Sequence, residues 1–262
     1  MNILADAHVH LYQEDQLASA LQAACINLDN LFAPPALNNT NIYKVLFLTE
    51  RRGCNVYAKL QSGTLQVEGF KRKGPEDSGL LFFEHAQLGE IAIAPGRQII
   101  SHEKLEVLCY LQDLIIPDGL PFGEILDHIN AASGVAAINW APGKWMFQRG
   151  KIISELIEKN PPGRFIFCDT SLRPRSWPRS KLLRQAQSKG FGVVCGTDPF
   201  PFPGEETRIG TYATLFENIP ADKINASLLK QLLLQPTGLV KFLGRRLAFP
   251  QVIYRVIRIK FH

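Results

Sequence analysis

The sequence of 262 residues lacks the marks of several protein classes. It has no run of 18 apolar residues, so we expect no membrane-spanning helix, and no basic, apolar leader follows Met1, so we expect a cytoplasmic protein. Its five cysteines are odd in number and lack CxxC spacing, which argues against a disulfide framework and a zinc knuckle. P-loop, GxSxG and GxGxxG motifs are absent. With 46% apolar and 20% charged residues, the chain is expected to fold around a sizeable core.

Acidic residues are missing from one end of the chain. Residues 223–262 contain eight Lys or Arg and no Asp or Glu, whereas residues 1–222 contain 21 basic and 24 acidic residues, a net charge of −3. The segment 237–262 mixes this charge with large apolar residues, which suits either packing on the body or contact with an anionic membrane surface or another protein. We expect no nucleic-acid partner, because the acidic body would repel phosphates and no RRM, KH or helix-turn-helix signature is present.

Short apolar runs alternate with amphipathic segments along most of the chain, which favours an α/β barrel or an open sheet. The predicted strands span 2–11, 43–49, 135–140, 164–168 and 191–197, and the predicted helices span 15–31, 121–133, 150–159 and 178–189. Between them, residues 54–111 hold short runs separated by glycine, which predicts a β-rich insertion. We therefore predict one α/β domain over 1–222 and a basic helical extension over 223–262.

The strongest local signal is Asp6-Ala-His8-Val-His10, at the end of the first predicted strand. Residues two apart in a strand point to the same face, so His8 and His10 can converge on one metal ion. Asp6 shares that face and is a candidate to fix the tautomer of a ligating histidine. The alternative is a polar cluster that holds no metal.

Further polar residues follow later strands. Asp198 ends a buried strand, where barrel active sites lie, or it accepts backbone hydrogen bonds in a proline-rich turn. Asp169 and Arg173 follow another strand and would lie on the same rim, where Arg173 could bind an anion. The alternative for this pair is a salt-bridged loop.

The Asp6–His10 motif resembles the HxH motif that opens the amidohydrolase-like metal barrels, and the order of later motifs resembles the polymerase and histidinol phosphatase (PHP) family. That family's second strand ends in Thr-Asp-His, where this chain has Thr49-Glu50-Arg51, and its closing Ser-Asp-x-His appears here as Thr197-Asp198-Pro199-Phe200. Its Gly-x-Glu-Ile and Ala-His-Pro segments appear as Gly96-Arg97-Gln98-Ile99 and Trp140-Ala141-Pro142. The resemblance covers about residues 1–215 and implies a distorted (β/α)7 TIM-like barrel, here with C-terminal helices.

Departures from the family pattern imply fewer metal ions. Three histidines and a glutamate of the family are replaced by Arg51, Gln98, Ala141 and Phe200. The ligand set that the resemblance leaves is His8, His10, Asp198 and Glu50. Such a set would hold one Zn²⁺, Mn²⁺ or Fe²⁺ with a position open for water, or no metal if the site is degenerate.

Two functions remain open at this point. The first is metal-dependent hydrolysis of a small anionic substrate, such as a phosphoester. The residues expected to assist catalysis are Glu50, Asp169, Arg51 and Arg173, and those expected to support the metal ligands are Asp6 and Gln98. The second is a catalytically inactive barrel that serves as a binding or scaffold protein, held at the inner face of a membrane through its basic tail.

Overall fold

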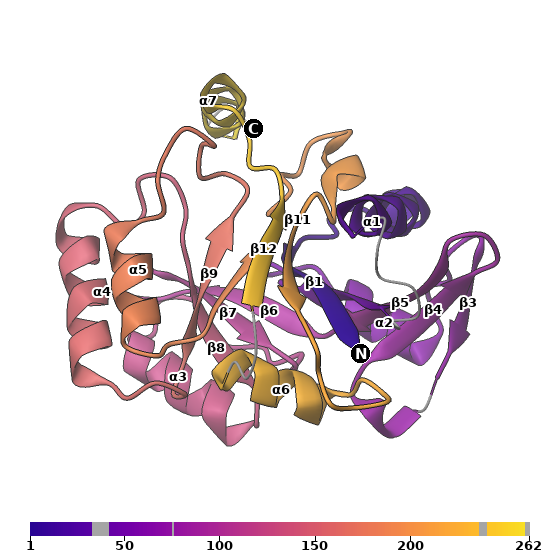
Figure 1. The fold of residues 1–262 in the computed structure, drawn as a ribbon, viewed down its shortest axis with the longest axis horizontal. Coiled ribbons are helices and arrows are strands. Elements are labelled where there is room, and N and C mark those ends of the chain that lie inside the picture. The colour runs from indigo at the N-terminus through magenta and orange to yellow at the C-terminus, as the bar shows by residue number, and fades with distance from the viewer. Residues whose placement is uncertain (33–41, 75, 236–239, 260–262) are drawn as a thin grey trace.

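The computed structural model describes residues 1–32, 42–74, 76–235 and 240–259. The chain forms two β-sheets with helices on their outer faces (Figure 1). The seven-stranded sheet has the order β12 (Val240–Gly244), β11 (Tyr212–Phe216), β1 (Asn2–Val9), β2 (Ile42–Leu48), β5 (Gly89–Ala94), β4 (Leu81–His85), β3 (Phe70–Lys73). The five-stranded sheet has the order β10 (Val193–Gly196), β9 (Ile166–Thr170), β8 (Val135–Asn139), β7 (Glu106–Tyr110), β6 (Gly96–Ile100).

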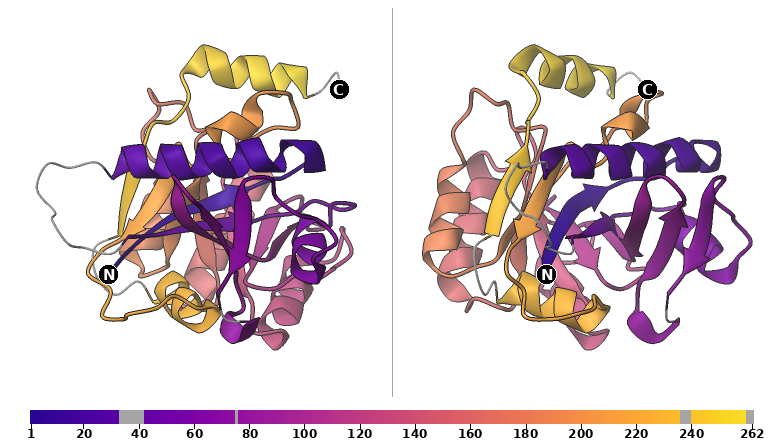
Figure 2. Two further views of the ribbon diagram at one scale, coloured as in Figure 1. Left: turned by 90° about the vertical axis from the view of Figure 1, so that its right-hand side faces the viewer. Right: turned by 45° about the vertical axis from the view of Figure 1, so that its right-hand side comes forward.

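The helices cover the outer faces and the ends of the sheets. The α-helices are α1 (Leu17–Leu31), α2 (Val56–Ser62), α3 (Phe122–Ala131), α4 (Phe147–Lys159), α5 (Lys181–Ser188), α6 (Ala226–Leu234) and α7 (Phe249–Arg258). The described residues also include the short 3-10 helices η1 (Glu14–Gln16), η2 (Glu76–Ser78) and η3 (Glu205–Arg208). Figure 2 shows α6 at one end of the molecule and α7 at the other.

Apolar side chains form a core between the sheets, a core on the outer side of each sheet, and a small cluster around Leu172 and Val252. The inner core takes alternate residues of β1 and β2, such as Ile3 and Val45, and adds Tyr110 of β7 and Ile166 of β9. The opposite face of β1 and β2 packs on α1, and the outer face of the five-stranded sheet packs on α3, α4 and α5. Both faces of the central strands are therefore buried, which explains their nearly continuous apolar sequences.

The α/β class holds, but the predicted TIM-like barrel is wrong, because the strands form two mixed sheets instead of one closed barrel. Residues 54–111, predicted as a β-rich insertion, contribute strands to both sheets. β5 pairs in parallel with β2, and β4 and β3 continue that sheet to an edge as antiparallel strands, whereas β6 and β7 belong to the other sheet. Among the described residues, an isolated bridge from Glu50 to Arg97 is the sole strand pairing between the sheets.

The basic C-terminal segment packs on the body. The predicted helical extension over 223–262 contains α6 and α7, with the strand β12 between them. Arg246 donates hydrogen bonds to the carbonyls of Pro174 and Trp177, at 3.1 and 3.0 Å, and Arg255 pairs with Glu205. These contacts agree with the alternative in which the segment packs on the body, and the predicted membrane contact is not supported. Within 237–262, the range predicted to make that contact, residues 237–239 and 260–262 lie outside the described residues. No described helix has the length and apolar character needed to span a bilayer.

Candidate metal centre

Two histidine side chains converge at the end of β1. His8 lies within the strand and His10 directly beyond it, and only 1% and 5% of their surfaces are exposed. Their Nε2 atoms are 3.0 Å apart, and their ring centroids are 4.8 Å apart. The spacing of two residues along an extended strand accounts for this convergence.

Asp198 brings a carboxylate to the same point from the end of β10. Its Oδ1 lies 3.5 Å from Nε2 of His8 and 3.7 Å from Nε2 of His10. Its backbone N–H donates to the carbonyl of His8 at 2.9 Å. Gly196 permits this approach, since a Cβ at that position would lie 2.1 Å from the backbone nitrogen of His8. β10 can therefore meet β1 only because residue 196 has no side chain.

The three ligand atoms have the spacing that a metal ion requires. All lie within 4.8 Å of one another, and the pairwise distances run from 3.0 to 3.7 Å. Metal–ligand bonds of about 2.0–2.2 Å in a tetrahedral arrangement place neighbouring ligands about 3.3–3.6 Å apart. Two imidazoles and one carboxylate suit Zn²⁺, Mn²⁺ or Fe²⁺, and three protein ligands leave a position for water. The residues present therefore fit a single divalent ion.

Asn139, at the end of β8, fixes the orientation of His8. Its Nδ2 donates to Oε2 of Glu106 at 2.9 Å, so its Oδ1 is left to accept from Nδ1 of His8 at 3.1 Å. Glu106 is held in turn by Lys144 at 3.2 Å. With its proton on Nδ1, His8 presents the lone pair of Nε2 to the centre, as a metal ligand must. The sequence analysis did not predict a role for Asn139. The one feature that could have pointed to it is its position near the end of the predicted strand 135–140.

Asp6 holds the backbone around the centre rather than an imidazole ring. Its buried carboxylate accepts hydrogen bonds from the N–H groups of Thr197 and Gly210, each at 2.8 Å, from the N–H of His8 at 3.2 Å, and from the Thr197 hydroxyl. Burial raises the pKa of Asp6, and the hydrogen bonds from Thr197 and Gly210 oppose that rise. Asp6 thus ties together β1, the end of β10 and the turn before β11.

Burial changes the proton affinities of two of the candidate ligands. It lowers the pKa of His10 well below its usual range, with further lowering from the nearby His8 and Arg51, so the ring is neutral at pH 7. Burial also raises the pKa of Asp198 to about 6, against the opposing effect of His8. A neutral imidazole and a desolvated carboxylate are both groups that a cation stabilises.

A cleft of about 750 Å³ opens beside two of the three candidate ligands, His10 and Asp198. His10 and Asp198 lie in its lining together with the predicted residues Arg51 and Gln98. The other lining residues are Tyr12, Ile100, Lys104, Glu106, Ala141, Pro142, Gly143, Lys144, Arg149, Leu172, Phe200, Val256 and Ile259. In the described part of the chain, Arg51, Lys104 and Arg149 form no ion pair with a carboxylate. Two of the candidate ligands therefore share the cleft with three cationic side chains that have no ion-pair partner among the described residues.

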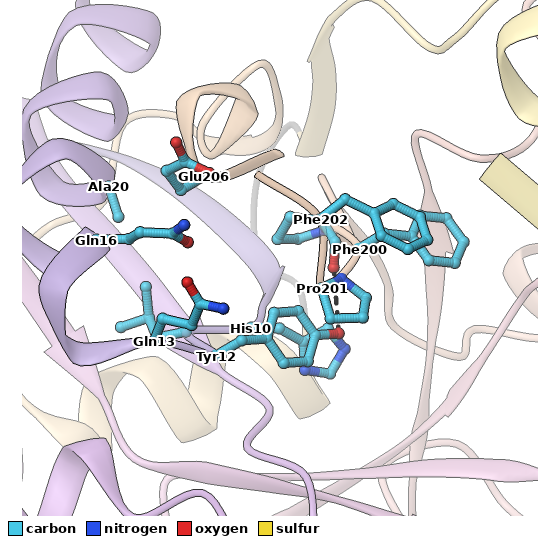
Figure 3. A pocket seen from close by; sticks show the side chains of 11 residues that line it. His10, Tyr12, Gln13, Gln16, Ala20, Phe200, Pro201, Phe202 and Glu206 are labelled. Atoms are coloured by element: carbon cyan, nitrogen blue, oxygen red, sulfur yellow. Dashed lines mark hydrogen bonds between the residues drawn. The ribbon is translucent and has the colours of Figure 1, made fainter. Parts of the chain in front are cut away.

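Tyr12 covers one side of His10 (Figure 3). The two rings stack with centroids 5.3 Å apart, and the Tyr12 hydroxyl donates to the carbonyl of Pro199 at 3.3 Å. Beside this contact a cavity of about 20 Å³ lies between α1 and the loop that carries Phe200 and Phe202, whose rings stack at 5.8 Å. That cavity has room for about one water molecule, so the larger cleft is the candidate substrate site.

Glu50, predicted as a fourth ligand, does not belong to this ligand group. Its Oε1 accepts from the backbone N–H groups of Val56 and Tyr57 at the start of α2, and its Oε2 lies 3.7 Å from Arg97. Burial raises the pKa of Glu50, and the charge of Arg97 opposes that rise. Glu50 therefore caps α2 in this structure, and its role as ligand or base stays a prediction.

Asp169 and Arg173 bind each other, and neither of them lines the cleft. Nε and Nη2 of Arg173 donate to the two carboxylate oxygens of Asp169 at 2.9 and 2.6 Å, and the hydroxyl of Tyr212 donates to the same carboxylate at 3.0 Å. Asp169 and Arg173 are both buried. These contacts match the salt-bridge alternative, and the catalytic roles predicted for this pair stay predictions.

Comparisons with known proteins place this site on a fold that other proteins share. No family model matches the sequence, and no curated protein matches it. PsfC from Pseudomonas syringae PB-5123 is similar with a TM-score of 0.58 at 15% identity, over 99% of this chain and 97% of PsfC. The lesion-specific endonuclease PfuEndoQ from Pyrococcus furiosus is similar with a TM-score of 0.52 at 12% identity, over 92% of this chain and 58% of the endonuclease. Endonuclease Q in complex with a 27-mer duplex that has an abasic lesion at the active site gives a TM-score of 0.48 at 11% identity, over 92% and 58%.

At these identities the similarities show the fold alone. The similarity to the PHP family therefore stays a resemblance, because no family model matches the sequence. This chain also spans only 58% of the length of PfuEndoQ. One prediction is corrected by the comparison: the exclusion of nucleic acid was wrong, because a protein with this fold is an endonuclease. The net charge of the body was a poor guide, since the local field of a cleft decides which ions it attracts.

Proposed function

We propose that this chain is a metal-dependent hydrolase of an anionic substrate, with a phosphoester as the first candidate. The observation that carries the proposal is the convergence of His8, His10 and Asp198 beside a cleft whose lining includes Arg51, Lys104 and Arg149. The fold similarity to PfuEndoQ supports it, because an endonuclease also cleaves phosphoester bonds.

Each part of the site has a role in this proposal. A divalent ion on the three ligands would polarise the substrate and lower the pKa of a bound water. Asn139 keeps Nε2 of His8 unprotonated, so that the ring is ready to bind the ion. The side chains of Arg51, Lys104 and Arg149 would bind the negative charge of the substrate, and an arginine can hold a phosphate through two hydrogen bonds.

Metal analysis tests the first half of the proposal. The purified protein is incubated with Zn²⁺, Mn²⁺ or Fe²⁺, desalted, and analysed by plasma mass spectrometry beside a variant that carries both His8→Ala and His10→Ala. We expect about one ion per wild-type chain and none in the double variant. His102→Ala is the matched control, because His102 is exposed and lies outside the cleft, and it should keep the ion.

Hydrolysis assays test the second half. The loaded protein is offered a phosphomonoester, a phosphodiester and a DNA duplex that contains an abasic site, and Arg51→Gln should raise KM more than it lowers kcat. A wild-type protein that binds no metal under any loading condition would overturn the proposal and favour a catalytically inactive binding protein.

A further inference from the structure

The cleft at the candidate metal centre is lined by two groups of side chains with unlike chemistry. One group carries positive charge and consists of Arg51, Lys104 and Arg149, with Lys144 already paired with Glu106. The other group is apolar and includes Leu172, Phe200, Val256 and Ile259. A site for a small hydrophilic anion needs the first group alone, so the second requires its own explanation.

The apolar group begins next to a metal ligand. Phe200 follows Asp198 by two residues, and it packs together with Val256 against a cluster that contains Leu172 and the buried Val252. Val252 and Val256 are four residues apart in α7 and therefore share one face of that helix. α7 thus uses the same apolar face both to pack on the body and to line the cleft.

An ion-pair network holds α7 in this position. Glu205 is 7% exposed, and its two carboxylate oxygens each lie 2.6 Å from a guanidinium nitrogen, one of Arg208 and one of Arg255. Arg208 also donates to the hydroxyl of Ser171 at 2.9 Å. Because Glu205 and Arg208 belong to η3, which follows the loop that carries Asp198, α7 is anchored to the segment that supplies a ligand. The apolar lining is therefore an ordered part of the site.

We propose that the substrate of this site joins an anionic group to an apolar body, and that Val256 of α7 and Ile259, the residue directly after α7, are specificity-determining residues for that body. The inference rests on the proposed function, since it takes the metal centre as the reacting point. The anion would bind near the metal ligands and the cations, and the body would displace water from Phe200 and Val256. A phosphoester of an aromatic or long aliphatic alcohol has this chemistry.

The test compares two dianions that differ only in their apolar body. Phenylphosphonate and methylphosphonate are titrated calorimetrically into the Zn²⁺-loaded protein, at a pH at which both are dianions. Their carbon–phosphorus bonds are not esters, so binding is measured without turnover. We expect the wild-type protein to bind phenylphosphonate about ten- to a hundredfold more tightly than methylphosphonate, as burial of a phenyl ring predicts.

Substitutions in α7 locate the source of that preference. Val256→Thr replaces a methyl group by a hydroxyl of similar size, and the preference should fall about three- to tenfold. Ile253→Thr is the matched control, because Ile253 lies on the same helix with 41% of its surface exposed and outside the cleft, and the preference should stay within about twofold of wild type. Circular dichroism checks the folding of each variant, and Ile259→Thr replaces Val256→Thr if that variant does not fold.

The outcomes separate this inference from the proposed function. Equal affinity of the wild-type protein for the two dianions would overturn the inference, while metal-dependent hydrolysis of both phenyl phosphate and methyl phosphate would still support the hydrolase. A preference that Val256→Thr and Ile259→Thr both leave unchanged would overturn the role of α7. Hydrolysis of neither ester by the metal-loaded protein would refute the proposed function, and the ratio of the two affinities would still decide the inference about the lining.

Discussion

Replacement of Asn139 by alanine tests whether the ring of His8 is oriented in advance for metal binding. In the wild-type protein, the side-chain amide of Asn139 links Nδ1 of His8 to Glu106 through hydrogen bonds of 3.1 and 2.9 Å. Asn139→Ala removes both bonds, so the imidazole can rotate or carry its proton on Nε2, the atom that faces His10. Glu106 keeps its ion pair with Lys144, so the damage should centre on His8.

The expected loss is one of affinity for the metal ion. Removal of a hydrogen-bond partner that orients a ligating histidine costs about 10- to 100-fold in metal affinity, or about 1.4–2.7 kcal/mol. The metal-free protein should lose about 1–3 kcal/mol in its free energy of unfolding, since Nδ1 of the buried His8 is left without a partner. Asn139→Ala should therefore remain folded and bind metal weakly.

Competition with a fluorescent zinc chelator measures the affinity, and ¹⁵N-detected NMR of the imidazole nitrogens reports which nitrogen of His8 carries the proton. Asn130→Ala is the control, because Asn130 is an exposed residue near the end of α3. An Asn139→Ala variant that binds zinc within about twofold of wild type would refute the argument that this amide presets the ring.

Three further predictions follow from contacts around the site. Gly196→Ala should lower the free energy of unfolding by about 3 kcal/mol and abolish metal binding, because its Cβ would lie 2.1 Å from the backbone nitrogen of His8 and 2.6 Å from Oδ1 of Asp6. Urea titrations measure the change, and a variant as stable as the wild type would contradict this prediction. Metal affinity should fall about tenfold for each pH unit below about 6, because the carboxyl group of Asp198, whose pKa is raised to about 6, must lose its proton to bind the ion. Calorimetry that finds no change in affinity down to about pH 4.5 would argue against Asp198 as a ligand. Glu205→Gln should speed the cleavage of α7 by trypsin, because it removes the charge that pairs with Arg208 and Arg255. An unchanged cleavage rate would show that apolar packing alone holds the helix.

The first strand shows how much of the site a local pattern can predict. The spacing of His8 and His10 predicts that their rings share a face, and the structure places both rings at one point. Later elements also follow their periodicity closely: the helix predicted over 121–133 is α3, at Phe122–Ala131, and the strand predicted over 135–140 is β8, at Val135–Asn139. Local patterns of this kind depend on residues that are near one another in the chain.

Features that depend on distant partners could not be predicted in this way. The apolar runs of 54–111 indicate strands, but they do not say that β5 pairs with β2 while β6 and β7 join the other sheet. Val56 and Tyr57 have the composition of a strand, yet they begin α2, and Glu50 turns to cap that helix. The hydrogen bond from His8 to Asn139 likewise joins residues 131 positions apart. A single sequence carries no signal for such a pair.

The side chains of the candidate metal centre come from β1 and from the end of β10, which the ribosome synthesises far apart in time. The carboxylate of Asp6 and the backbone of Thr197 bond directly although they are 191 positions apart, and Asp198 follows immediately. A nascent chain on the ribosome therefore exposes both imidazoles for most of translation before the carboxylate emerges. An ion at the proposed centre would use all three ligands only after β10 has docked on β1. It would then stabilise the finished fold by about 1.4 kcal/mol for each tenfold excess of free ion over its dissociation constant. The melting temperature of this protein should in consequence rise with the concentration of free metal ion.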